Sequence, residues 1–343
     1  MAHDDPTPRA LRRDLSVDEY FAGVRARNLA VLSRALTLVE SANPQHQLLA
    51  EELLTRLLPH TGGAIRVGIS GTPGSGKSTF IESLGTQLVR SGHRVAVLAI
   101  DPSSGVTGGS ILGDKTRMAN LAADANAYIR PSPSAGTLGG VARKTRESML
   151  VCEAALYDII LIETVGVGQS ETYVADMTDS FVALTTPGQG DELQGIKRGL
   201  LEVVDFLVIN KADGENKQPA ELAARQYRTA LESIAGHATN STDDGAPEVF
   251  TCSALHHEGV DQVWTAIAAR HTAMQQDGRL TDRRQKQNLR WLWSIIEDRL
   301  RQSLYAHPKV QTLRAALEQK VLTGELPVES AARQLLDAYS TNT

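Results

Sequence analysis

The sequence has few cysteines, no long apolar run and no excess of basic residues. Only two of its 343 residues are cysteine, Cys152 and Cys252, which is too few for a disulfide framework or a cysteine-rich zinc site. No apolar run approaches the roughly 18 residues of a membrane span, and residues 1–14 lack the apolar segment of a secretory signal. A formal net charge of -5 disfavours sequence-independent binding to nucleic acid. We therefore expect a soluble, cytoplasmic protein.

The hydrophobic periodicity divides the chain into three parts. Residues 1–60 are predicted to form an N-terminal helical extension, in which Ser16 and Glu19 form a candidate capping box and Pro44 breaks the leucine pattern. Residues 61–275 have the pattern of an α/β domain, and residues 276–343 return to a helical pattern as a C-terminal arm. The sequence shows no internal repeat and no long low-complexity segment.

The central part alternates between short apolar runs and helical segments. Six runs rich in β-branched residues are predicted as strands, at residues 65–70, 94–100, 158–163, 180–186, 205–210 and 248–253. Helices are predicted between most of them, including residues 77–90, 139–156 and 219–234, and an exposed loop at residues 237–247. This alternation is typical of a mostly parallel sheet that is covered by helices on both faces.

A phosphate-binding loop follows the first predicted strand. The sequence GTPGSGKST fits the pattern G-x-x-x-x-G-K-[ST] and opens a predicted helix, as the motif requires. Lys77 is expected to reach the β and γ phosphates, and the Ser78 hydroxyl is expected to ligate Mg²⁺. The predicted phosphate-binding residues are Gly71, Thr72, Pro73, Gly74, Ser75, Gly76, Lys77, Ser78 and Thr79.

An acidic residue follows a later strand in the manner of a D-x-x-G motif. In ETVGVGQ, Glu163 ends the predicted strand and Gly166 lies three positions later. The carboxylate is expected to polarise Mg²⁺ or its water, and the Gly166 amide to meet the γ-phosphate. The acid is glutamate where many GTPases have aspartate. Val167 replaces the usual water-orienting glutamine, so we expect slow intrinsic hydrolysis.

Two further segments predict a guanine-binding site. NKAD supplies Asn210, Lys211 and Asp213 directly after a predicted strand. The Asp213 carboxylate can accept hydrogen bonds from guanine N1–H and its exocyclic amine, whereas adenine would leave it unpaired at a cost of about 1–3 kcal/mol. The companion base loop follows the next predicted strand, at Ser253, Ala254 and Leu255. GTP is therefore the favoured nucleotide.

With these motifs and its longer segments, the sequence resembles the MeaB or ArgK-type GTPases. The resemblance rests on IDPSS, ILGDKTRM, RPSPSAGTLGG, ETVGVGQSE and PGQGDELQGIKRG, and it covers residues 16–320. These GTPases are chaperones of adenosylcobalamin-dependent acyl-CoA mutases, so the resemblance implies such a mutase, of the methylmalonyl-CoA mutase type, as the partner. The chain lacks a D-x-H-x-x-G cobalamin signature, and the cofactor is therefore expected on the partner.

The resemblance also implies roles for individual residues. It adds Asp101 and Asp114 to Ser78 and Glu163 as the Mg²⁺ set, and it makes residues 186–197 an additional switch loop that ends at Lys197. We predict Lys77, Glu163 and Lys197 as catalytic residues.

Other positively charged residues are candidates for the charge donor near the γ-phosphate. They are Arg117 and Arg143, although each is more readily explained as an ordinary surface cation.

The apolar face of the C-terminal arm leaves two interpretations open. Trp291 lies on one side of the predicted helix. The opposite face is marked by five apolar residues: Leu289, Leu292, Ile296, Leu300 and Leu304. The resemblance implies that one face contacts the other subunit of a homodimer. Burial of that face within the chain's own fold is the alternative.

Two other functions remain as alternatives on the sequence alone. The first is a P-loop kinase linked to arginine or ornithine transport, which NKAD disfavours because kinases usually bind ATP. The second is a nickel metallochaperone GTPase, for which His256 and His257 beside the base loop are the only suggestive feature.

Overall fold

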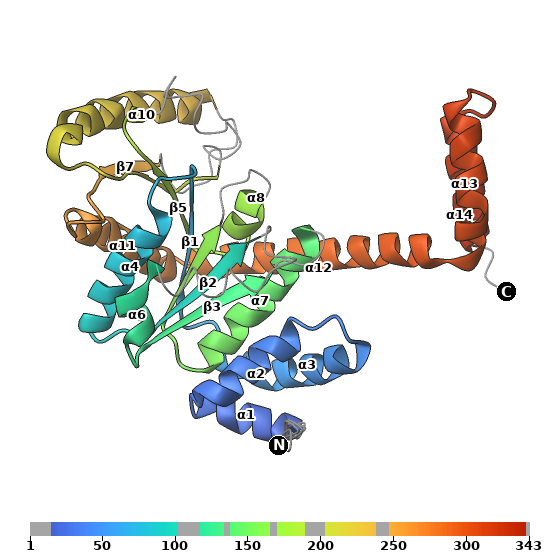
Figure 1. Cartoon of the computed structure of the whole chain (residues 1–343), viewed down its shortest axis with the longest axis horizontal. Coiled ribbons are helices and arrows are strands. Elements are labelled where there is room, and N and C mark those ends of the chain that lie inside the picture. Colours follow the sequence, from blue (N-terminus) through green and yellow to red (C-terminus); the bar gives the residue numbers. More distant parts are fainter. Residues whose placement is uncertain are drawn as a thin grey trace, which may run out of the picture. The chain divides into compact units, whose positions relative to one another are not determined.

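The structure, a computed structural model, describes residues 15–101, 117–133, 138–164, 170–188, 203–237 and 247–340. The chain divides into two units, Met1–Arg283 and Arg284–Thr343. The first unit holds the sheet and the predicted nucleotide site, and the second consists of helices (Figure 1). None of the described helices combines the length and the apolar character that crossing a membrane would require.

A single parallel sheet forms the centre of the first unit, with the strand order β3-β2-β4-β1-β5-β6-β7. The strands are β1 (Ile65–Gly71), β2 (Val95–Asp101), β3 (Ala127–Pro133), β4 (Ile159–Thr164), β5 (Ser180–Thr185), β6 (Phe206–Ile209) and β7 (Glu248–Thr251). The predicted α/β fold is thus confirmed. Because every pairing is parallel, all carboxyl ends meet at one edge, where such sheets bind ligands.

The prediction of six strands was wrong by one, because β3 was missed. Its sequence, AYIRPSP, contains two prolines and a charged residue, a pattern that is more typical of a loop than of a strand. The structure places β3 at the edge of the sheet, paired only with β2. An edge strand tolerates proline because one side of its backbone needs no ladder hydrogen bond.

Helices cover both faces of the sheet and create two apolar cores. On one face lie α4 (Lys77–Arg90), α6 (Ala119–Ala123) and α11 (Val260–Gln276). On the other lie α7 (Leu138–Ala154), α8 (Ser170–Ala175) and α10 (Lys217–His237), which begins after a short 3-10 turn, η2 (Gly214–Asn216). The predicted helix at 77–90 has the bounds of α4, and the other two predictions agree within a few residues.

The N-terminal extension consists of α1 (Val17–Arg25), α2 (Leu29–Val39), α3 (Pro44–Leu57) and the turn η1 (Leu58–His60). Both hydrogen bonds of the predicted capping box between Ser16 and Glu19 are present. Pro44 occupies the first turn of α3, where its missing N–H costs nothing, so it begins a helix there. Of the leucine stripe in α3, Leu53 is fully buried, whereas Leu48 is exposed.

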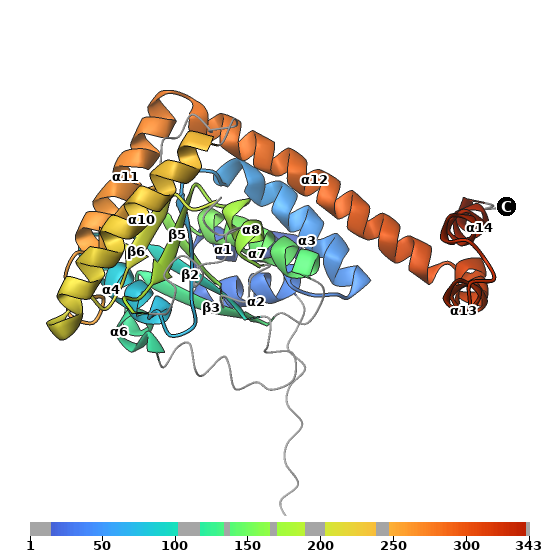
Figure 2. The same ribbon diagram turned by 90° about the horizontal axis from the view of Figure 1, so that it is seen from above.

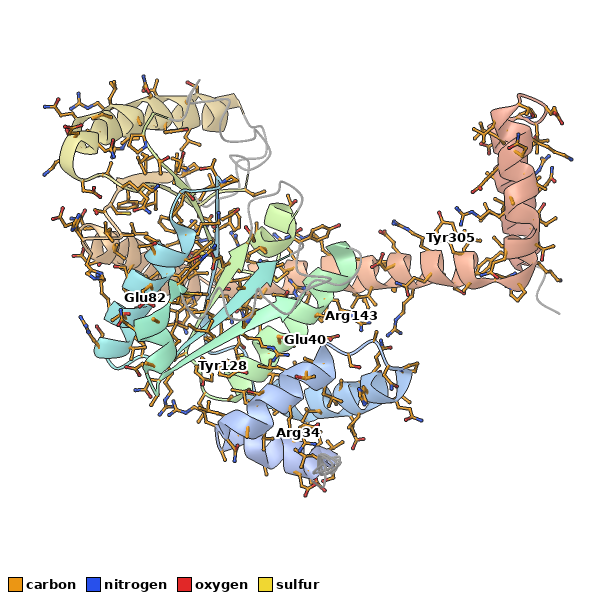
Figure 3. The ribbon with its side chains drawn as sticks, viewed as in Figure 1. Arg34, Glu40, Glu82, Tyr128, Arg143 and Tyr305 are labelled. Atoms are coloured by element: carbon orange, nitrogen blue, oxygen red, sulfur yellow. The ribbon has the colours of Figure 1, made fainter. Side chains whose placement is uncertain are left out.

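Polar contacts fasten these helices to the edge strand. The Arg130 guanidinium of β3 donates from both Nε and a terminal nitrogen to the Glu40 carboxylate at the end of α2. The Tyr128 hydroxyl, also on β3, lies 3.0 Å from Ser33 Oγ on α2 (Figure 3). The buried side chains of α1 to α3 belong to the same apolar core as α7 and β2. The N-terminal helices therefore form an outer layer of the first unit.

The second unit contains most of α12 (Arg279–Ala306), together with α13 (Pro308–Leu322) and α14 (Val328–Ser340). α13 and α14 lie side by side (Figures 1 and 2). The Tyr339 hydroxyl of α14 donates to Ser303 Oγ on α12 at 3.0 Å, and its ring packs against the His307 ring. The C-terminal arm is therefore helical, as the periodicity predicted.

Two neighbouring tyrosines provide a test of polar satisfaction in the first core. The Tyr157 hydroxyl is buried without a hydrogen-bond partner among the described residues, and burial raises the pKa of Tyr157 to about 12. We predict that Tyr157→Phe stabilises the protein by about 1 kcal/mol, because it removes an unsatisfied buried group. Tyr128→Phe is the matched control. It should lower the free energy of unfolding by about 1 kcal/mol, because it removes the hydrogen bond with Ser33. Urea unfolding measures both changes, and a destabilised Tyr157→Phe would contradict the prediction.

Candidate functional site

The predicted phosphate loop lies between the end of β1 and the start of α4. A Cβ atom on Gly71, which ends β1, would lie 2.2 Å from the carbonyl oxygen of Leu184 on β5. Gly76, the N-cap of α4, has a left-handed φ of 85°. Glycine is required at the first position by contact with backbone and is favoured at the second by conformation. The loop therefore turns tightly into a helix N-terminus, which is a favourable place for an anion.

The Lys77 side chain folds back over this loop. Its ammonium group donates to the carbonyl oxygens of Gly71 at 3.0 Å and Thr72 at 3.3 Å. The hydroxyl groups of Thr72 and Ser75 are buried and have no hydrogen-bond partner in the part of the chain that the structure describes. A cation and unsatisfied hydroxyl groups at a helix N-terminus complement the oxygens of a phosphate chain. The loop and the first turn of α4 also contain Pro73, Gly74 and Thr79.

A hydroxyl and a carboxylate meet beside the phosphate loop. Ser78 lies in the first turn of α4 and Glu163 near the end of β4, and Ser78 Oγ donates to Glu163 Oε1 at 3.0 Å. Glu163 is only 9% exposed. Hard oxygen donors of this kind are the ligands that Mg²⁺ prefers, and Mg²⁺ usually retains several waters beside one or two carboxylates. The two side chains therefore fit a Mg²⁺ ion that also contacts a nucleotide phosphate.

The Asn210 side chain joins the two halves of the site. It follows β6, is 2% exposed, and its Nδ2 donates to the carbonyl oxygen of Ser75 at 2.8 Å. Its Oδ1 accepts from the backbone N–H of Ala254 at 3.0 Å and from the Cys252 thiol at 3.5 Å. The amide thus connects the phosphate loop with the predicted base loop, which follows β7. Burial raises the pKa of the Cys252 thiol to about 12, so this cysteine is an inert part of the packing.

The predicted base-reading carboxylate is held by a hydroxyl from the base loop. Ser253 Oγ donates to Asp213 Oδ2 at 2.6 Å, which fixes one carboxylate oxygen. Lys211 adopts a left-handed φ of 60° between Asn210 and Asp213. Leu255 is 70% exposed beside the base loop. The Asp213–Ser253 contact therefore orients the Asp213 carboxylate as an acceptor. It joins the segment that contains Lys211 to the base loop that contains Leu255.

Several predicted residues are not brought into this cluster by the described structure. Asp101 ends β2 at the same sheet edge, but its side chain is outside the described part of the chain. Asp114, Gly166 and Lys197 also lie outside the described residues. The Arg143 guanidinium lies 3.6 Å from the carboxylate of Glu147, one turn further along α7 (Figure 3).

Of two other predictions, the structure describes one fully and one in part. Arg117 is exposed, as expected of an ordinary surface cation. Of the predicted switch segment, the structure describes residues 186–188, directly after β5.

Sequence reasoning missed a buried hydroxyl pair behind the site. Thr164 Oγ1, at the end of β4, donates to Ser70 Oγ on β1 at 2.8 Å, and both residues are fully buried. The bond ties the strand that leads into the phosphate loop to the strand that carries Glu163. Its sequence signal is a hydroxyl residue at or next to the carboxyl end of each of the two strands.

Comparisons with known proteins agree with this geometry. A Caulobacter vibrioides protein named as a GTPase is 54% identical over 95% of this chain and 98% of its own length. The mouse protein "Methylmalonic aciduria type A homolog, mitochondrial" is 45% identical over 95% of this chain and 80% of its own length. A solved structure of a protein named as an LAO/AO transport system kinase is 39% identical, with a TM-score of 0.77 over 97% of this chain and all of that chain.

The fold, with its phosphate loop at the carboxyl edge of the sheet, defines a P-loop GTPase, an enzyme that binds guanine nucleotide and hydrolyses GTP. A family model described as "Methylmalonyl Co-A mutase-associated GTPase MeaB" matches residues 32–309, and the chain belongs to this family. The resemblance stated from the motifs is therefore confirmed.

We predict that Asp213→Asn weakens GTP binding about 10- to 100-fold, because hydrogen bonds to a charged acceptor contribute about 1.5–3 kcal/mol. The variant should bind xanthosine triphosphate more tightly than the unaltered protein does, since xanthine carries a carbonyl where guanine has its amine. Ser253 can still donate to the new amide oxygen, which keeps the loop in place. Equilibrium binding of both nucleotides measures the exchange. Unaltered GTP affinity would show that Asp213 does not read the base.

Proposed function

We propose that this GTPase is a Mg²⁺-dependent chaperone of an adenosylcobalamin-dependent acyl-CoA mutase of the methylmalonyl-CoA mutase type. In this proposal, GTP hydrolysis is coupled to loading or protection of the mutase cofactor. The observation that carries it is membership of the mutase-associated family over residues 32–309, joined to a site built for guanine nucleotide. The mouse relative, named for methylmalonic aciduria, supports the same mutase.

The proposed hydrolytic site uses the residues at the carboxyl edge of the sheet. The loop amides and the Lys77 ammonium bind the β and γ phosphates and neutralise charge that develops during transfer. Ser78 and Glu163 would hold Mg²⁺ together with Asp101 and Asp114, and the ion would supply electrostatic stabilisation of negative charge on the phosphates. The buried Glu163 carboxylate would then have a cation as its partner.

Two sequence features shape the remaining roles. We assign the Gly166 amide to the γ-phosphate and Lys197 to the far end of the switch loop that reports nucleotide state to the mutase. Val167, next to Gly166, has no group that can orient a water molecule, so slow hydrolysis by the chain alone follows. Such a protein acts as a timer whose rate a partner controls. Cobalamin belongs to that partner.

The experiment is a purified two-component assay. Methylmalonyl-CoA mutase and this protein are mixed with GDP, with GTP or with a non-hydrolysable GTP analogue, and complex formation and hydrolysis are measured. We expect a complex whose affinity changes with the nucleotide, and GTP hydrolysis that is faster with the mutase than without it.

The matched control is Asp213→Asn, in which the same responses should follow xanthosine nucleotides in place of guanosine nucleotides. A mutase that neither binds nor changes hydrolysis in any nucleotide state would contradict the proposal. That outcome would leave the GTPase activity itself intact.

We also propose a homodimer that forms through the C-terminal arm, residues 276–343. Four large apolar side chains on one face of α12 are 50–61% exposed in the single chain: Leu289, Leu292, Trp293 and Leu300. At 100° per residue they form one stripe together with the partly buried Ile296. Burying about 100 Å² of each such side chain against a second copy would contribute roughly 2–3 kcal/mol per residue.

Trp293→Asp tests the dimer. We expect the variant to be monomeric in sedimentation and light scattering, because a carboxylate in the middle of an apolar interface would lose its water without gaining a partner. Gln302→Asp is the matched control, since nine residues at 100° per residue place it on the opposite side of α12, where it is exposed. A Trp293→Asp variant that dimerises as well as Gln302→Asp would contradict the proposed interface.

The alternatives have less support. The solved relative is named as a kinase, but the Asp213–Ser253 pair favours a guanine nucleotide, and other relatives are named as GTPases. No observation within the described residues favours nickel delivery. A cytoplasmic location stays part of the proposal.

A further inference from the structure

The base loop continues into a small hairpin that the guanine-binding motif does not explain. Ser253 and Glu258 exchange two backbone hydrogen bonds of 2.9 and 3.0 Å, which close the hairpin. His257 has a left-handed φ of 59° in this turn. Gly259, with φ of 74°, passes so close to Thr251 that a Cβ atom would lie 2.7 Å from its carbonyl oxygen. The hairpin therefore has a definite conformation at both ends.

His257 connects this hairpin with the helix of the phosphate loop. Its Nδ1 lies 2.7 Å from Ser83 Oγ, on the second turn of α4. Ser83 is 1% exposed, whereas His257 is exposed, so the imidazole reaches inward from the surface to a buried hydroxyl. A hydroxyl can donate or accept, and the contact is therefore possible for either imidazole tautomer.

The same hairpin begins with the group that holds the base reader. Ser253 Oγ donates to Asp213 Oδ2, and the next residue, Ala254, donates its N–H to Asn210. Asn210 thus fastens the inner end of the loop, and the His257–Ser83 contact fastens its outer end. Both attachments lead to α4 or to the phosphate loop that precedes it. The apolar side chains of α11, which follows the hairpin, share a core with those of α4.

We propose that His257 is a positioning residue for guanine recognition. Its contact with Ser83 holds the base-loop hairpin against α4, and this keeps the Ser253 hydroxyl on the Asp213 carboxylate. The proposal rests on the assignment of Asp213 as the base reader. Loss of the contact lets the hairpin move away from α4, so that Asp213 loses orientation and guanine nucleotides dissociate faster.

The backbone conformation at position 257 determines which variants are informative. Left-handed φ favours glycine and tolerates asparagine, so neither His257→Gly nor His257→Asn strains the turn. Glycine removes the side chain. Asparagine places an amide atom at the same distance from the backbone as histidine Nδ1, and it can therefore restore the contact with Ser83. Ser83→Ala removes the contact from the helix side without disfavouring the helix.

The experiment follows release of GDP and of inosine diphosphate from the full-length protein. Inosine lacks the exocyclic amine that Asp213 is expected to read, so the ratio of the two rates reports base recognition. In His257→Gly we expect GDP to dissociate about three- to tenfold faster, the range of one lost hydrogen bond, and inosine diphosphate to change less. In GTP hydrolysis, His257→Gly should raise KM more than it lowers kcat. His257→Asn should return the rate of GDP dissociation towards that of the original protein.

A double-mutant cycle identifies the contact responsible. Ser83→Ala alone should accelerate GDP release as His257→Gly does, and the two changes together should add nothing further. Unaltered GDP release, equal acceleration of both nucleotides, or full additivity would each overturn the proposal. Asp213→Asn is measured alongside. If it leaves the ratio of the GDP and inosine diphosphate dissociation rates unchanged, Asp213 is not the base reader, independently of the result for His257.

Discussion

The buried amide of Asn210 is the contact on which the nucleotide site depends. It uses its nitrogen for the phosphate loop and its oxygen for the base loop, and it is nearly inaccessible to water. A buried amide that lost either partner would cost about 1–3 kcal/mol, so the two loops are held in one relative position. The same amide explains Gly76, because a Cβ atom there would lie 2.7 Å from Asn210 Nδ2. The conformation that favours glycine at position 76 is thus matched by the close approach of a side chain from a distant part of the chain.

The metal side of the site has a comparable logic. Glutamate is one methylene longer than the aspartate found in many GTPases, and here Glu163 Oε1 receives a hydrogen bond directly from Ser78. β1 and β4 are adjacent in the sheet, and the Ser70–Thr164 bond closes their ends together. The separation between the phosphate loop and the acid is therefore fixed by strand pairing. Mg²⁺ would replace a hydrogen bond that already orients both of these side chains.

The sequence predicted those parts of the fold that have a periodic or motif signal. Six strands, the bounds of α4 and the positions of Lys77, Ser78 and Asp213 followed from apolar runs and fixed spacings. The edge strand β3 escaped prediction because its prolines are acceptable only where no neighbour pairs with one side, which is a fact of tertiary structure. Contacts between distant polar residues, such as His257 with Ser83, escaped because no spacing rule relates their positions. Only the arrangement of helices around the sheet brings them together.

The polar groups at the amino ends of the strands differ from those at the carboxyl ends. At the amino edge, charged groups are paired: Arg66 Nε lies 2.6 Å from Glu153 Oε1 in a buried ion pair, and Asp205 accepts from Arg270 at 2.7 Å. At the carboxyl edge, the hydroxyl groups of Thr72 and Ser75 are buried without partners among the described residues. Unsatisfied buried groups oppose folding, and a fold retains them where a ligand completes their hydrogen bonds. A bound nucleotide whose phosphate oxygens accept hydrogen bonds from these hydroxyl groups should therefore stabilise the carboxyl edge of the sheet.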